Sequence, residues 1–471
     1  MIGKQQIVLD AATWLKGMSS GSEVSDGGFS DETSDVNLIA DPGVLYAPTT
    51  ASDADTDVIL DDEIIASCPD AAAGSPFDAM VMTDDGDFMT YNGTKLADVT
   101  GGQDTTRTYT KGTSDMVPWL GRIYFTSQEQ LGEWQLPSTF NFTFSALANT
   151  AADPPHPLLV FENNLYIADG NLLKRMTTVG GTVSTILTLG TNEFITALGI
   201  DPGTGKMLIA TSYGQNASDT IARTNKILWY DGFSNKVSKS VIVEDRVTAL
   251  HTHGGVTYVG YGISVGYLNG SGITFMRRLG NMSLAQAELP YKHNFASIGR
   301  TMYIIDGASI LARGPIIGEQ SIWYYAFENQ TNTNKYQAIF NAGNNKLGLS
   351  FATTKFRTLD VTSKASLGTW DFYTNWLVFP RPVQIRSIDI HFNEAIVSSA
   401  NWAFAYFDQS STSAITSSLA SLHGTQTSVT ELNDIVGFTN KLSAFKLYIN
   451  VGTSTENKGI KRIIIRYDFV E

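Results

Sequence analysis

A pattern of strand, turn and strand recurs along most of this 471-residue chain, and it limits the possible folds more than any other feature. Residues 157–176 carry the pattern most clearly, because Glu-Asn-Asn and Asp-Gly-Asn separate apolar runs at 158–161, 165–168 and 172–176. Asn, Asp and Gly tolerate positive φ and therefore suit hairpin turns. Runs of four or five residues are too short for helices and typical of strands. This stretch predicts an antiparallel meander.

Similar units occur before and after this stretch, and the second strand of each unit is the easiest one to follow. The expected second strands are centred near Phe88, Tyr124, Tyr166, Leu208, Tyr258, Tyr303 and Leu349. Successive markers are roughly 36 to 50 residues apart, a period typical of propeller blades. We therefore expect an all-β fold with a β-propeller of about seven blades, within a range of six to eight. Two β-sandwiches are the alternative, but the constant order of strands and turns favours the propeller.

Three regions follow from the change of pattern along the chain. Residues 1–75 are polar and rich in acidic and small side chains, which predicts an extended N-terminal arm. This arm either ties the protein to a neighbouring subunit, or is a floppy terminus, or folds along its own domain. Residues 76–365 form the expected propeller. Residues 366–471 contain long alternating strands such as 383–392, which predicts a C-terminal β-sandwich of jelly-roll type.

Composition excludes several classes of function. The net charge is −14 and charged residues make up only 17% of the chain. A general nucleic-acid binder presents a basic stripe, so specific nucleic-acid binding is not expected. An acidic chain also does not favour an anionic membrane surface.

Targeting signals and covalent links are not expected either. No apolar run approaches the length of about 18 residues that a membrane span requires, and the short apolar core near the N-terminus does not suit a secretory signal. Cys68 is the single cysteine, so the chain cannot form an internal disulfide.

One candidate calcium motif has the wrong residues at two required positions. Asp53, Asp55 and Asp57 have the first spacings of a calcium loop, but Val58 and Ile64 stand where glycine and glutamate are required.

The run from Gly203 to Lys206 is similar to part of a phosphate-binding loop. Ile200 and Met207 occupy the positions that need glycine and a hydroxyl residue, so a strand turn is expected. Asp84, Asp85 and Asp87 flank Gly86 and also fit a hairpin turn.

Other candidates are weighed against ordinary structural roles. His251 and His253 are two residues apart and face one side of a strand, but no third metal ligand lies nearby in the sequence. Many propellers are glycosidases that use paired carboxylates. The candidates for such carboxylates and for sugar-stacking rings are Asp169, Asp231, Asp306, Trp370, Trp376 and Trp402. Turn chemistry and core packing explain them better, so we predict no catalytic, cofactor-binding or metal-binding residues, no cofactor and no enzymatic activity.

One segment resembles a known class of proteins. Residues 26–48 read DGGFSDETSDVNLIADPGVLYAP, with Gly-Gly-Phe-Ser, a later Asn-Leu and a Pro-Gly turn. This segment is similar to the opening of tail-associated structural proteins of tailed bacteriophages. Phrases such as Asp231-Gly232-Phe233 in the repeats also resemble tail proteins built on β-propellers, among them the tail nozzle of short-tailed phages.

The resemblance implies a non-enzymatic virion structural protein, a component of a bacteriophage tail or of its host-contact apparatus. Such a protein assembles in the host cytoplasm, works through contacts with other tail proteins, and is expected to form a homo-oligomeric ring. A host receptor or glycan is a further possible partner. The alternative function is a carbohydrate-binding or glycoside-cleaving β-propeller protein.

Overall fold

The computed structural model describes most of the chain, and everything below concerns these residues. They are 5–14, 44, 52–53, 63–69, 79–92, 96–99, 104–135, 139–149, 155–214, 224–270, 272–279, 290–315, 321–328, 335–351, 355–362, 370–408, 426–436, 438, 440–451 and 458–470. Two compact units are distinguished, residues 52–308 with 331–358, and residues 1–51 with 309–330 and 359–471.

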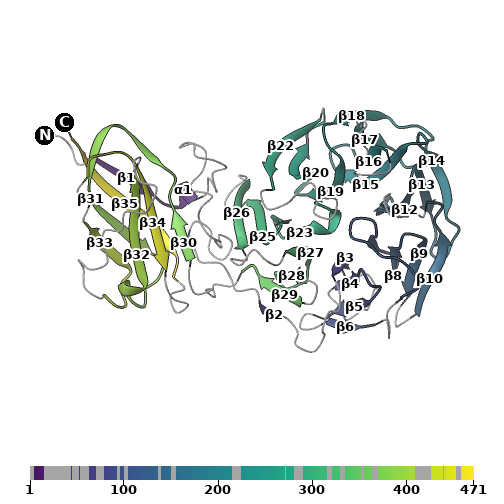
Figure 1. Ribbon diagram of the computed structural model, residues 1–471, viewed down its shortest axis with the longest axis horizontal. Helices are drawn as coiled ribbons and strands as arrows, with labels where there is room; N and C mark the ends of the chain where they lie inside the picture. The colour runs from purple at the N-terminus through teal and green to yellow at the C-terminus, as the bar shows by residue number, and fades with distance from the viewer. Residues whose placement is uncertain are drawn as a thin grey trace. The chain divides into compact units, whose positions relative to one another are not determined.

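Seven four-stranded antiparallel sheets form a β-propeller (Figure 1). The first three blades are β3 (Ile64–Pro69), β4 (Ala79–Thr83), β5 (Phe88–Tyr91) and β6 (Leu96–Asp98); β7 (Met116–Trp119), β8 (Arg122–Thr126), β9 (Gln130–Gln135) and β10 (Thr139–Ala146); and β11 (Leu158–Phe161), β12 (Asn164–Asp169), β13 (Leu172–Met176) and β14 (Ser184–Thr188). The next two are β15 (Glu193–Asp201), β16 (Lys206–Tyr213), β17 (Asn225–Tyr230) and β18 (Lys239–Val243); and β19 (Val247–His253), β20 (Val256–Tyr261), β21 (Ser264–Leu268) and β22 (Ile273–Arg278). The sixth is β23 (Phe295–Ile298), β24 (Thr301–Asp306), β25 (Ser309–Pro315) and β26 (Ser321–Glu328).

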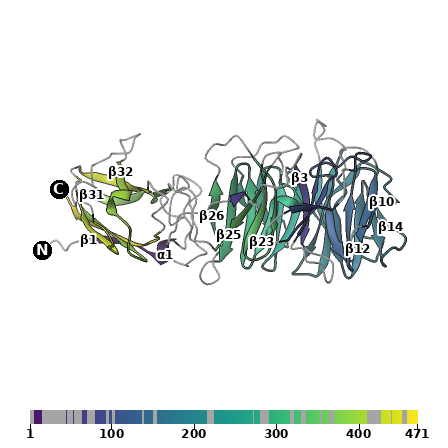
Figure 2. The same cartoon turned by 90° about the horizontal axis from the view of Figure 1, so that it is seen from below.

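The seventh blade combines strands from distant parts of the chain. Its inner strands are β27 (Tyr336–Asn341), β28 (Lys346–Phe351) and β29 (Lys355–Asp360), and its outer strand is β2 (Ser52–Asp53). Ser52 pairs with Thr358 and Asp53 with Arg357. The N-terminal part of the chain therefore completes the last blade, and the first and last blades meet through β3 and β27. Figure 2 shows the blades edge-on, with their strands running through the thickness of the propeller.

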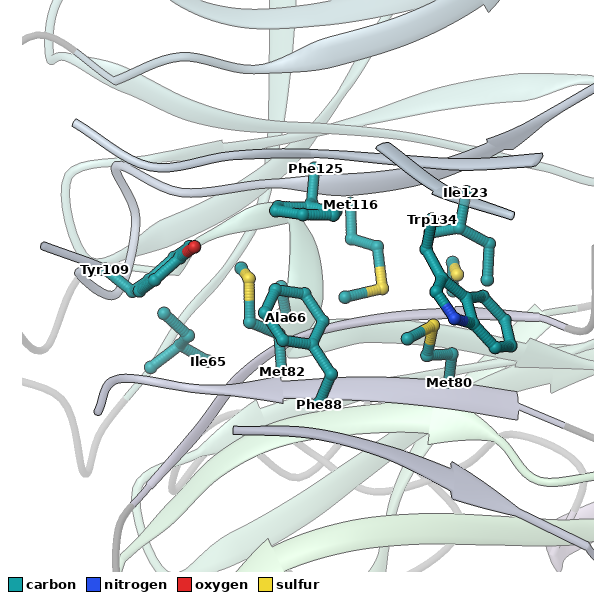
Figure 3. Close-up of a cluster of buried hydrophobic side chains, with 11 residues drawn as sticks. Ile65, Ala66, Met80, Met82, Phe88, Tyr109, Met116, Ile123, Phe125 and Trp134 are labelled. Atoms are coloured by element: carbon teal, nitrogen blue, oxygen red, sulfur yellow. The ribbon is translucent and has the colours of Figure 1, made fainter. Parts of the chain in front are cut away.

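Apolar clusters between neighbouring blades hold the propeller together. In the cluster between the first two blades, Phe88 of β5 and Phe125 of β8 pack with ring centroids 4.5 Å apart (Figure 3). Cys68 is a buried, reduced member of this cluster. Gly132 of β9 contacts the Phe125 ring directly. A Cβ at this position would lie only 2.3 Å from the ring. Gly132 and Phe125 face each other across neighbouring strands of the second blade, so this fit holds the Phe125 ring where it meets Phe88 of the first blade.

The expected all-β propeller of about seven blades is confirmed, with differences in the seventh blade, whose outer strand β2 comes from the predicted arm, and in the first blade. The predicted second strand near Phe88 is in fact the third strand, β5, and the second is β4. The first strand, β3, lies within the predicted arm. Its Ile-Ile-Ala-Ser-Cys-Pro sequence is buried at five of six positions. The nine-residue segment DAAAGSPFD separates it from β4 and is longer than the turns between the first and second strands of the other blades, which hides the repeat. With β4 as the marker, the first interval becomes about 43 residues and the period becomes more regular.

The C-terminal region forms a seven-stranded sheet together with the first strand of the chain. Its strands are β1 (Gln5–Leu9), β30 (Trp370–Tyr373), β31 (Leu377–Phe392), β32 (Trp402–Asp408), β33 (Glu431–Ile435), β34 (Leu442–Val451) and β35 (Ile460–Phe469). β31 is 16 residues long and pairs with β34, β33 and β35 at different points of its length. β1 pairs with β35 in the same unit, so the described parts of the predicted arm, β1, β2 and β3, are strands paired within the chain.

Helix is nearly absent from the described residues, which hold only α1 (Ala11–Trp14) and the 3-10 turns η2 (Lys292–Asn294) and η3 (Ser399–Asn401). None of the described helices is long and apolar enough to cross a membrane. Residues 414–422, which suit helix or strand, and most of the resemblance segment 26–48 lie outside the described residues.

Candidate functional site

A polar site with donors from several blades surrounds Asp115, which directly precedes the innermost strand of the second blade. Its carboxylate is buried and accepts five hydrogen bonds. The backbone N–H groups of Met116 and Leu158 each donate over 2.7 Å. The Lys292 ammonium reaches both oxygens, at 2.9 and 2.8 Å, and His293 Nε2 lies 2.8 Å from Oδ1. We call Asp115, Lys292 and His293 the Asp115 hub.

These contacts come from elements far apart in the sequence. Leu158 begins β11 of the third blade, whereas Lys292 and His293 belong to η2, just before β23 of the sixth blade. The backbone N–H of Ser67, in β3 of the first blade, donates to His293 Nδ1 over 3.2 Å. The hub therefore joins four of the seven blades across the centre of the propeller.

The same contacts define the protonation states in the hub. Because His293 Nδ1 accepts from a backbone N–H, its Nε2 carries the hydrogen that is donated to Asp115. Burial alone raises the pKa of Asp115, but the charge of Lys292 and the hydrogen bond from His293 lower it by more and hold the pKa at about 2. The carboxylate stays ionised, and all of its acceptor capacity is used within the protein.

A small cavity lies beside the hub, among the residues that begin the innermost strands. Its volume is about 30 Å³, and Thr196 of β15, Thr248 of β19 and Tyr291 contribute to its wall. Thr248 donates to the carbonyl of Pro290 over 2.8 Å. The Thr196 hydroxyl is buried and has no hydrogen-bond partner among the described residues. A cavity of this size holds about one or two water molecules, and a sugar ring needs considerably more room.

The two candidate histidines face one side of β19, as predicted, but bind different groups. His251 Nε2 lies 2.8 Å from the Ser297 hydroxyl, and His253 Nε2 lies 3.0 Å from the Arg300 carbonyl oxygen. Burial lowers the pKa of His251 to about 4. In the described part of the chain, no three His, Cys, Asp or Glu side chains are grouped as metal ligands.

The three candidate carboxylates are not brought together. Asp169 and Asp306 end the second strands β12 and β24, whereas Asp231 follows the third strand β17. Second and third strands of an antiparallel blade end at opposite faces. Asp169 accepts from the backbone N–H groups of Ala148 and Asn149 at 2.7 and 2.8 Å.

Asp231, in contrast, has a local role in a turn. It accepts from the N–H groups of Phe233 and Ser234 at 2.9 and 2.8 Å in an exposed turn. Backbone bonds within the chain, long-range for Asp169 and local for Asp231, thus account for both carboxylates without a substrate.

The remaining candidates occupy ordinary structural positions. Asp201 accepts from Gly203 N–H over 3.0 Å and from the Thr204 hydroxyl over 2.7 Å, which forms the expected strand turn.

The aromatic candidates divide into core and partly exposed residues. Trp370 and Trp402 are buried core residues with ring centroids 6.2 Å apart, while Trp376 is partly exposed. Asp55 and Asp57 of the calcium-like spacing lie outside the described residues.

Comparisons with known proteins assign no family to this chain. No protein-family model matches the chain, and no curated protein matches its sequence. A solved structure of "YCF48 bound to D1 peptide" is 9% identical with a TM-score of 0.43, and the match covers 67% of this chain and 97% of that one. The Neurospora crassa Pan2 WD40 domain is 10% identical with a TM-score of 0.43, over 63% of this chain and 89% of that one. YCF48 from Cyanidioschyzon merolae is 8% identical with a TM-score of 0.43, and the match covers 66% of this chain and 99% of that one. Similarity at this level says nothing about what this chain does.

Sequence reasoning did not single out the Asp115 hub. A signal was present, since Thr-Ser-Asp precedes the first strand of one unit and Tyr-Lys-His-Asn precedes the first strand of another. Polar residues directly before an innermost strand are placed near the propeller axis. Their pairing with each other required the three-dimensional arrangement.

Proposed function

We propose that this protein is a non-enzymatic virion structural protein, a component of a bacteriophage tail or its host-contact apparatus, that acts through contacts between subunits. The observation that carries the proposal is the Asp115 hub. This buried polar cluster binds blade to blade, and its carboxylate is saturated by donors of its own chain. Catalytic carboxylates instead need free acceptor capacity directed at a substrate.

This arrangement makes the propeller rigid. Breaking a buried ion pair by removing one partner costs several kcal/mol, so a hub that spans four blades resists opening of the propeller. A tail component transmits force and positions its neighbours, and both tasks favour rigid blades. The resemblance of residues 26–48 to tail-associated proteins supports the same proposal.

We extend the proposal to the C-terminal region, which we infer to be a β-sandwich of jelly-roll type. Phe392 of β31 and Trp402 of β32 lie in strands that do not pair, yet their ring centroids are 4.6 Å apart. This contact supports a sheet that folds back so that two layers enclose one core. In a tail, this region would contact other virion proteins.

Oligomeric assembly and charge belong to the same proposal. A tail component would form a homo-oligomeric ring. A protein of net charge −14 would not bind the DNA that passes through such a ring. Host surface groups, including glycans, are contacts that such an apparatus would make.

Quantitative mass spectrometry of purified particles of the encoding virus tests the proposal. The expected result is a fixed copy number per particle that persists through density-gradient purification, whereas a late non-structural protein is removed by the same steps. Absence of the protein from particles overturns the proposal.

A further inference from the structure

The outer strand of each propeller blade has one edge whose backbone groups pair with no strand of the same sheet, and such edges can pair with another chain. Proteins limit this pairing with very short edge strands and with bulges. In this propeller, β2 has two residues and β6 has three. The ladders that join β10, β14, β22 and β26 to their third strands all contain register shifts.

β18 is different from every other described outer strand. Its five residues pair with β17 in continuous register, from Lys239 with Trp229 to Val243 with Asn225. Neither a bulge nor shortness protects this edge.

The side chains of β18 also favour pairing. Val241, Ile242 and Val243 are β-branched, which suits a strand. The Ile242 side chain is 74% exposed, the largest fraction among the exposed large hydrophobic residues. Val237, just before the strand, is 37% exposed. Burial of Ile242 against a partner would therefore remove apolar surface from water.

Charges at the two ends of this segment have opposite sign. Lys236 and Lys239 lie at its start and Glu244 and Asp245 at its end, and all four side chains are exposed. Lys239 Nζ is 4.2 Å from the centroid of the Trp229 ring, which holds one positive charge at the start of the strand. An antiparallel copy of the same segment would place its acidic end beside this basic end.

We propose that the outer edge of β18 binds the same edge of a second copy of this chain. Antiparallel pairing centred on Val241 forms the longest ladder, with Lys239 opposite Val243 and Ser240 opposite Ile242 of the other copy. The two Ile242 side chains then lie on one face as diagonal neighbours, within reach of each other. Because the same residues contact each other from both sides, the contact has two-fold symmetry and forms a dimer.

This contact is independent of the proposed virion role. It pairs subunits two by two, so it is separate from any contact that closes a ring. The contact would form in a dimer of the free protein as well as between subunits of a larger assembly.

Sedimentation velocity of the full-length protein over a range of concentrations tests the inference. The wild-type protein should show a monomer–dimer equilibrium, and Ile242→Lys should weaken dimerisation at least about tenfold, since it places a charge at the centre of the contact. Phe275→Lys is the matched control, because Phe275 is 59% exposed on β22, whose ladder carries a register shift. It should leave the equilibrium unchanged.

A charge exchange tests the antiparallel arrangement. The double variant Lys236→Glu/Lys239→Glu should also weaken dimerisation at least about tenfold, and adding Glu244→Lys and Asp245→Lys to it should restore the wild-type equilibrium. A wild-type protein that stays monomeric at all concentrations overturns the proposal. So does a dimer that Ile242→Lys leaves intact, or a fourfold variant that remains as weak as the double one.

Discussion

The Asp115 carboxylate lies 2.8 Å from the Lys292 ammonium nitrogen although 177 residues separate the two in the chain. Asp115 is almost fully buried, while the Lys292 side chain is 35% exposed. The pair therefore combines a desolvated anion with a cation that still contacts water, and backbone donors from two blades complete the anion's surroundings. Such an arrangement stabilises the propeller only while the carboxylate is ionised.

Acid should remove the contribution of Asp115. Its pKa is about 2 in the folded protein, below the value of 3.8 expected for the unfolded chain. Stability from this group is thus fully present above about pH 4 and lost as the pH falls toward 2. We predict that Asp115→Asn is less stable than wild type at pH 7, and that urea denaturation shows the gap closing between pH 4 and 2.

Asp231→Asn is the matched control for this measurement. An asparagine oxygen can accept the same turn bonds that Asp231 Oδ1 accepts from Phe233 and Ser234. Its free energy of unfolding at pH 7 should stay within about 0.5 kcal/mol of wild type. A gap between wild type and Asp115→Asn that is the same at every pH contradicts the assigned pKa.

His251 should stay neutral far below the usual range of imidazoles. Burial lowers its pKa to about 4, whereas a histidine in the unfolded chain titrates near 6.5. The unfolded state therefore binds the proton first, and stability from this group is present above about pH 6.5 and lost as the pH falls to 4. An NMR titration of the histidine side chains measures the pKa of His251 directly, and the His251→Asn variant identifies its resonance. A His251 resonance that titrates near pH 6.5 refutes this prediction.

Gly132→Ala should destabilise the contact between the first two blades. A Cβ at Gly132 would lie 2.3 Å from the Phe125 ring, which packs against Phe88. Overpacking of this kind costs about 1–3 kcal/mol, and chemical denaturation measures it. Gly272→Ala is the control, because nothing lies within 4 Å of its added Cβ. Equal stability of the two variants would show that the Phe125 ring moves aside without measurable cost.

Removal of residues 1–60 should loosen two sheets at once. The truncation deletes β2, the outer neighbour of β29, and β1, the outer neighbour of β35. Backbone amides of β29 and β35 should then exchange hydrogen faster, because exposed edge strands open more readily. Hydrogen exchange with mass spectrometry measures this, with β16 in the fourth blade as the internal control. Unchanged exchange in residues 355–360 would show that β2 does not secure the seventh blade.

The repeat predicted the propeller well because each blade is built from local hairpins. Residues 158–161 and 172–176 are the observed bounds of β11 and β13, since Asn and Gly residues fix where the chain turns. β3 was missed because nine residues, rather than a tight turn, separate it from β4, and β2 because its pairing with β29 spans about 300 residues. Local sequence cannot show either pairing.

The candidate site was less predictable than the fold. Asp115, Lys292 and His293 are single polar residues with no mutual spacing in the sequence, and only the closed ring brings them together. Asp231 was correctly attributed to turn chemistry, whereas Asp169 accepts from Ala148 and Asn149, about 20 residues earlier in the chain. The aspartate directly before Gly232 already indicated the local bonds that Asp231 forms.

The most direct test of the account is a double-mutant cycle on Asp115 and Lys292, because its central claim is that this ion pair holds the blades together. Asp115→Asn, Lys292→Met and the double variant are compared with wild type by chemical denaturation at pH 7. The exposed pair of Lys458 and Glu394, also 2.8 Å apart, is the control and should couple by less than about 1 kcal/mol. We predict a coupling energy of about 1–3 kcal/mol for the hub pair. Additivity within about 0.5 kcal/mol would contradict the claim.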